Sequence, residues 1–141
     1  DEIEIRGDGN MTNITAALQL ALDRLRPYVQ KLSDHPERAE HPLPLVLLFS
    51  DGEHNVGPGP QNVAAEIKSL TLDGEPVVIA AAGVSIGSDH PDEQTLREIA
   101  SPECYCHINN VQKFSYFISS VGSSGASRPK DIADVIKNLP E

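Results

Sequence analysis

The chain has 141 residues, which suits one domain with a real hydrophobic core. Its net charge of −10, from 21 acidic and 11 basic side chains, argues against a surface for nucleic acid or anionic membranes. No apolar run approaches the roughly 18 residues of a membrane-spanning helix, and two cysteines are too few for a disulfide framework. We therefore expect a cytoplasmic protein that neither inserts into membranes nor binds nucleic acid.

Helices and strands are predicted to alternate along the chain. The expected ranges are a helix at 13–25, a strand at 45–49, a helix at 60–70, a strand at 76–82, a helix at 93–100, a strand at 104–108 and a helix at 111–121. Pro27 is predicted to break or kink the first helix, whereas Pro60 suits the start of the second. Asp73-Gly74 is predicted to end that second helix, and Phe114, Phe117, Ile118 and Val121 are predicted to point inward from the last one. The alternation predicts an α/β fold, with an open, mainly parallel Rossmann-like sheet and helices on both faces.

The C-terminal part changes in composition. The stretch "GSSGASRP" is rich in small residues and is typical of a flexible linker, whereas Ile132, Val135, Ile136 and Leu139 follow helical spacing. The expected organisation is therefore a domain at 1–122, a flexible linker at 123–130 and a short amphipathic helix at 131–141.

One acidic residue lies where the fold would place a ligand. Asp51 directly follows the most apolar predicted strand, and open α/β sheets bind ligands beyond the carboxyl ends of their strands. An Asp-Gly pair also makes ordinary turns, so position alone leaves Asp51 with either role.

The segment "GNMTNITAAL" (9–18), followed by "LVLLFSDGEHN" (45–55), resembles the von Willebrand factor type A (vWA) domain in its bacterial form. "VVIAAAGVSIG" and "LREIASPE" match later elements of that family. The resemblance implies a metal-ion-dependent adhesion site in which Thr12 and Asp51 are ligands of Mg²⁺ or Mn²⁺. The rim that it implies for contact with a partner consists of Asn13, Gly52, Glu53, His54 and Asn55.

The sequence departs from the family pattern in one respect. The family's D-x-S-x-S motif, which supplies a direct carboxylate and two hydroxyls, does not occur in these 141 residues. We therefore expect this segment to be the C-terminal two-thirds of a vWA-like domain, with metal binding that is weak or absent on its own. The family's first strand would lie beside 45–49, so that edge is expected to need upstream strands or another chain.

The resemblance implies a non-enzymatic module that binds a protein partner, whose acidic side chain would complete the metal coordination. One alternative is an aspartate-based phosphoryl-transfer or phospho-acceptor domain with Asp51 as the nucleophile, and another is a metal-independent scaffold. The sequence shows no nucleophile–base pair, and no further acidic residue or Lys follows "VVIAAAG" or "CYCHI". In "CYCH", strand alternation places Cys104 and Cys106 on one face and His107 on the other, which favours core packing over a zinc site.

Overall fold

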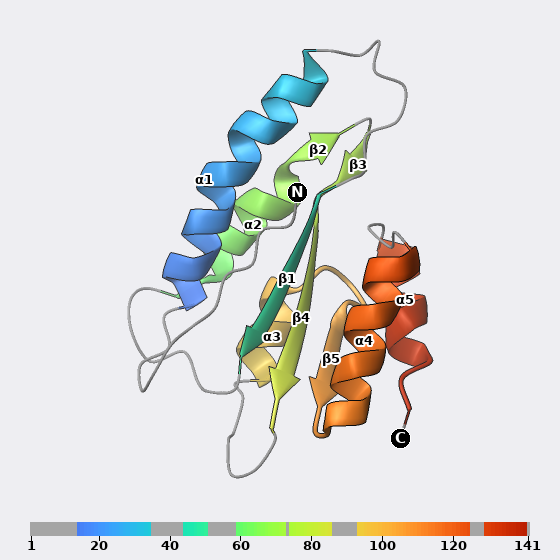
Figure 1. Ribbon diagram of the computed structural model, residues 1–141. Helices are drawn as coiled ribbons and strands as arrows, with labels where there is room; N and C mark the ends of the chain where they lie inside the picture. Colours follow the sequence, from blue (N-terminus) through green and yellow to red (C-terminus); the bar gives the residue numbers. More distant parts are fainter. Residues whose placement is uncertain are drawn as a thin grey trace.

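A three-stranded parallel sheet organises the protein, whose computed structural model describes residues 14–34, 44–50, 59–72, 74–85, 93–124 and 129–140. Figure 1 shows the elements in chain order: α1 (Ile14–Ser33), β1 (Leu45–Ser50), α2 (Gln61–Ser69), β2 (Thr71–Leu72), β3 (Glu75–Pro76), β4 (Val78–Val84), α3 (Glu93–Ile99), β5 (Tyr105–Ile108), α4 (Val111–Ser124) and α5 (Pro129–Lys137). The predicted alternation of helices with strands in a parallel α/β sheet is confirmed.

The strand order is β1-β4-β5. β1 pairs with β4 from Leu45 opposite Val78 to Ser50 opposite Gly83, and β4 pairs with β5 up to Val84 opposite Ile108. β4 is therefore the central strand of this sheet.

Helices cover both faces of the sheet, as predicted, because successive strand residues point to opposite sides. On one face, α1, α2 and α3 pack against Leu48, Ile79 and Ala81. On the other face, α4 and α5 pack against a second set of strand residues, namely Val78, Ala80, Ala82, Cys104, Cys106 and Ile108. Both crossovers, through α2 and through α3, run over the first face, as expected for right-handed connections that cross a sheet in one direction.

The first helix includes Pro27. α1 continues through Pro27 to Ser33, so of the two outcomes predicted at Pro27, a break or a kink, the break is wrong. Pro27 lies on the exposed side of α1, where water can hydrate the carbonyl of Asp23, which loses its helical donor. The opposite side of α1 is buried along its whole length by Ile14, Leu18, Leu22, Leu25, Val29 and Leu32. That buried stripe holds the helix together across the proline.

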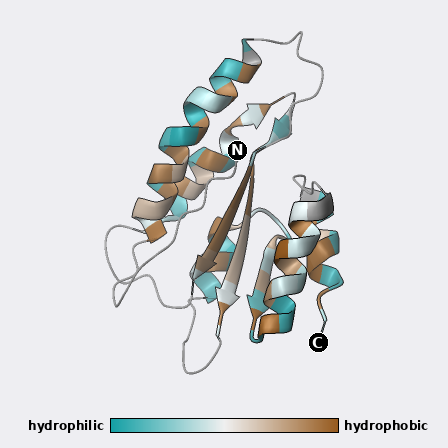
Figure 2. Cartoon of the chain, in the orientation of Figure 1, coloured by the Kyte–Doolittle hydropathy of each residue, from teal (hydrophilic) through white to brown (hydrophobic). Residues whose placement is uncertain are grey.

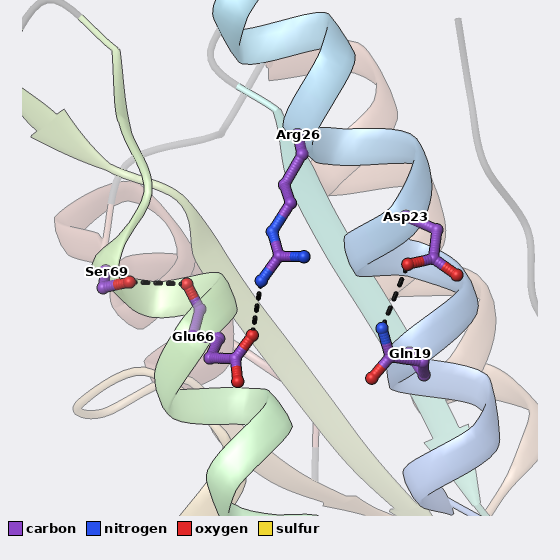
Figure 3. A network of polar contacts seen from close by, with 5 residues as sticks. All are labelled: Gln19, Asp23, Arg26, Glu66 and Ser69. Atoms are coloured by element: carbon purple, nitrogen blue, oxygen red, sulfur yellow. Dashed lines mark hydrogen bonds and ion pairs between the residues drawn. The ribbon is translucent and has the colours of Figure 1, made fainter.

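α1 and α2 are joined at the surface by polar side chains (Figure 3). The guanidinium of Arg26 on α1 donates to the Glu66 carboxylate on α2 at 2.6 Å, and within α2 the Ser69 hydroxyl donates to the Glu66 carbonyl at 2.7 Å. Both side chains of the ion pair are about half exposed, so this contact contributes little beside the buried stripe.

A small hairpin separates α2 from β4. α2 begins after Pro60, as predicted, but it ends at Ser69 and not at Asp73-Gly74. Residues 71–72 then pair with 75–76 in a two-stranded antiparallel ladder, so Pro76 belongs to β3 and not to the central strand. Gly74 has a φ of 80°, a conformation that glycine adopts without strain.

α4 buries less of its apolar surface than predicted. Phe117 and Val121 are buried, whereas Phe114 and Ile118 are 38% and 39% exposed. The Phe114 ring packs against the Phe49 ring of β1 at a centroid distance of 5.4 Å. The prediction that Phe114 and Ile118 point fully inward is therefore wrong, because in the described chain no further element covers the sheet beyond β1.

β1 is hydrophobic along nearly all its length (Figure 2), yet most of it is only half-buried. Among the described residues it pairs with β4 alone, so its other edge carries no ladder. By contrast, β4 is buried from Val78 to Gly83.

Candidate functional site at the carboxyl edge of the sheet

The residues that the sequence predicts as ligands and rim all lie outside the described residues. They are Thr12, Asn13, Asp51, Gly52, Glu53, His54 and Asn55. Their neighbours in the chain are described: α1 begins at Ile14, and β1 ends at Ser50. Figure 1 shows the beginning of α1 and the arrowhead of β1 at the same end of the domain.

Three strands contribute aligned residues to this carboxyl edge. Ser50 lies opposite Gly83, and Gly83 lies opposite His107, so the three form one row across β1, β4 and β5. Residues that pair in register point to the same face, here the face that α1, α2 and α3 cover. Gly83, the middle residue of this row, has no side chain and is buried.

Beyond this row, a serine, a histidine and a glutamate come together. The Ser85 hydroxyl and Nε2 of His107 form a hydrogen bond of 2.6 Å. Nδ1 of the same imidazole lies 4.0 Å from Oε1 of Glu93, at the start of α3. The Ser85 backbone is fixed as well, because its N–H donates to the Ile108 carbonyl at 2.9 Å.

Tyr105 and Arg97 lie beside this cluster. The Arg97 guanidinium stacks 4.6 Å from the centre of the Tyr105 ring. Burial, and next the negative charge of Glu93, raise the pKa of Tyr105 to about 12. The Tyr105 hydroxyl is buried without a well-aligned hydrogen-bond partner among the described residues, and the acidic side chain that it faces is that of Glu93.

The sequence shows no nucleophile–base pair in any local spacing, whereas the fold brings the side chains of Ser85 and His107 into a hydrogen bond. The contact was hidden because 22 residues separate the two side chains and only the register of β4 with β5 joins them. A signal was nevertheless present, since alternation places Ser85 on the same face as Gly83, two residues earlier.

The two cysteines lie in the core, as predicted. Cys104 and Cys106 are outside any disulfide and are buried on the face that α4 and α5 cover. Burial raises the pKa of Cys104 to about 11, helped by Glu103, and burial raises the pKa of Cys106 to about 12. Both thiols therefore stay protonated and unreactive at neutral pH.

Comparison with known families identifies the fold. A family model, the von Willebrand factor type A domain, matches residues 2–122. The chain belongs to the vWA family. No curated protein and no solved structure matched it.

Membership in the vWA family gives a general function. Domains of this family generally act as protein-interaction modules, and they can hold Mg²⁺ or Mn²⁺ at an adhesion site. Within the described ranges, no group of three or more His, Cys, Asp or Glu side chains is arranged to hold a metal ion. No helix in those ranges is long and apolar enough to cross a membrane.

Proposed function

We propose that this vWA domain binds a protein partner through a divalent ion at the carboxyl edge of its sheet. Thr12 and Asp51 are the proposed protein ligands, with Asn13, Gly52, Glu53, His54 and Asn55 as the rim that meets the partner. The observation that supports the proposal is the position of two element ends: α1 begins two residues after Thr12, and β1 ends directly before Asp51.

The donor set suits Mg²⁺ or Mn²⁺. A carboxylate and a hydroxyl are hard oxygen ligands, and Mg²⁺ commonly uses one or two carboxylates and completes six positions with water. An acidic side chain of the partner would replace one such water. This role is binding and involves no reaction at Asp51. Two protonated, buried thiols fit a reducing compartment such as the cytoplasm.

Titration with Mn²⁺, followed by NMR, tests the metal site. We expect weak binding, with a Kd of ~mM, because only one charged ligand is present. The amide signals of Ile14 and Ser50 should broaden in the wild type and broaden much less in Asp51→Ala and Thr12→Val. In the control Asp134→Ala on α5, they should broaden as much as in the wild type. Equal broadening in Asp51→Ala and wild type would refute the proposed ligands, and micromolar affinity lost in Asp51→Ala would refute the incompleteness of the site.

We further propose that a strand from upstream sequence or another chain pairs with the open edge of β1. The half-burial of β1 supports this, since apolar edge strands recruit partners. The added strand would be parallel to β1, and the chain would continue from it to a further strand on its outer side. The helix of that connection would lie on the face of α4, because a right-handed connection that runs across the sheet in the opposite direction covers the opposite face. That helix would cover the exposed Phe114 and Ile118.

A further inference from the structure

We propose that Ser85 is an activated nucleophile, with His107 as its general base and Glu93 as the residue that positions the imidazole. The three side chains come from three elements: Ser85 follows β4, His107 lies on β5 and Glu93 begins α3. The proposed reaction is acyl transfer from small, activated carboxylic esters. This activity is separate from the proposed metal site and needs no ion.

The geometry has the order of contacts that activates a hydroxyl. Ser85 and Nε2 of His107 are within hydrogen-bond reach at 2.6 Å, so the imidazole can take the hydroxyl proton as the oxygen attacks. Glu93 lies on the opposite ring nitrogen at 4.0 Å, where its charge favours the imidazolium that forms. Contacts of this kind are commonly looser before substrate binds.

A purely structural role explains the Ser85–His107 contact less well. β4 and β5 are already joined by their ladder and by the Ser85 N–H bond to the Ile108 carbonyl. Ser101 shows what a structural serine looks like here, since it is 6% exposed and its hydroxyl accepts the Ile79 N–H. Ser85 is instead half-buried, and the side chains of His107 and Glu93 are 39% and 49% exposed. A reagent in solution can reach all three.

The chemistry balances with these groups alone. The Ser85 oxygen bonds to the ester carbonyl carbon, its proton passes to Nε2 of His107, and the bond to the alcohol breaks as His107 returns the proton to the leaving oxygen. Water then attacks the acyl-serine by the same route, with His107 as base, and releases the carboxylic acid. Because all three side chains are partly exposed, small esters with a good leaving group, such as p-nitrophenyl acetate, are the substrate class that the cluster fits.

Covalent labelling of the whole chain tests the nucleophile. A fluorophosphonate probe should form a bond between its phosphorus and the Ser85 oxygen, with loss of fluoride, and mass spectrometry should locate the adduct on Ser85. We expect about a 100-fold slower labelling and p-nitrophenyl acetate hydrolysis in His107→Gln, the usual scale for loss of a general base. Ser85→Ala should abolish both, and the surface control Ser69→Ala should change neither.

Glu93 requires a measurement of its own because it acts through His107. Glu93→Gln should slow labelling several-fold and shift its pH profile, whereas Glu93→Asp should restore part of the rate. Labelling in EDTA should equal labelling in Mg²⁺, which separates this site from the metal site. The proposal is overturned if wild type is not labelled at Ser85, or if a folded His107→Gln, checked by circular dichroism, is labelled as fast as wild type.

Discussion

β1 and β4 are neighbouring strands with opposite relations between sequence and burial. β1 carries the larger side chains, in "LVLLFS", yet only Leu48 and Ser50 are buried. β4 carries mainly small ones, in "VIAAAGV", and it is buried except at Val84. β1, which has the larger apolar side chains, is therefore the less buried of the two strands.

The difference comes from neighbours and not from composition. β4 has a strand on each side and helices over both faces. β1 has one strand neighbour within the described residues, and on one face its Leu45, Leu47 and Phe49 are only partly packed. An apolar strand sequence thus indicates that other elements must cover the strand, and for β1 the described residues supply only part of that cover.

Matched truncations on the two strands should show the largest effect. Ile79→Ala on β4 should lower the free energy of unfolding by about 2–5 kcal/mol, because it leaves a cavity among residues that cannot collapse around it. Leu47→Ala on β1 removes the same number of carbons from a half-buried position and should cost less than about half as much. Urea denaturation of both variants measures this, and equal losses would contradict the comparison.

Alkaline pH should give a smaller effect through Cys106 of β5, which is buried although β5 also lies at an edge of the described sheet. The pKa of the Cys106 thiol is raised by burial from 9.0 to about 12, so above pH 9 the unfolded chain releases a proton that the folded chain keeps. The free energy of unfolding should therefore fall as pH rises above 9, by up to about 1.4 kcal/mol per pH unit for each such thiol.

Urea denaturation between pH 8 and pH 10.5 measures this slope, which Cys106→Ala should reduce. Below pH 9 the two thiols should resist alkylation until the chain is unfolded. Rapid alkylation of the native protein at pH 8 would contradict the burial of these thiols and would show that β5 is as exposed as β1.

The smallest change in unfolding free energy, about 1 kcal/mol or less, is expected for Leu47→Lys, since the long apolar stem can lie along the surface while the ammonium reaches water. Its effect should appear in association, because charge on an edge strand blocks pairing. Light scattering should show wild type above 15.2 kDa at high concentration and Leu47→Lys closer to it. Leu20→Lys, at an exposed leucine of α1, is the control and should associate like wild type. A wild-type monomer stable to concentration would contradict pairing between copies.

Much of the fold followed from local patterns. The apolar runs predicted β1 and β4 to within about two residues at each end, and Pro60 correctly marked the start of α2. The hairpin of β2 and β3 was not predicted, because strands of two residues are too short to show a periodic pattern. Pro27 does not end α1, because the buried stripe of the helix outweighs one lost hydrogen bond.

The two candidate sites also differ in how much of each the sequence predicts. Thr12 and Asp51 were predicted from the resemblance of short local segments to the vWA family, and they remain a prediction. The contact of Ser85 with His107 and Glu93 depends on the register of two strands and on the placement of α3. No local pattern contains that information.

α5 bears on how this protein should be expressed. The family match ends at residue 122, and a clone trimmed to that border would lack α5. Yet Ile132 of α5 is fully buried and packs with Val78 and Phe117 of the domain. The truncated protein would expose the apolar surface that Ile132 covers. Its poor yield or precipitation would then result from the position of the truncation and not from the behaviour of the domain.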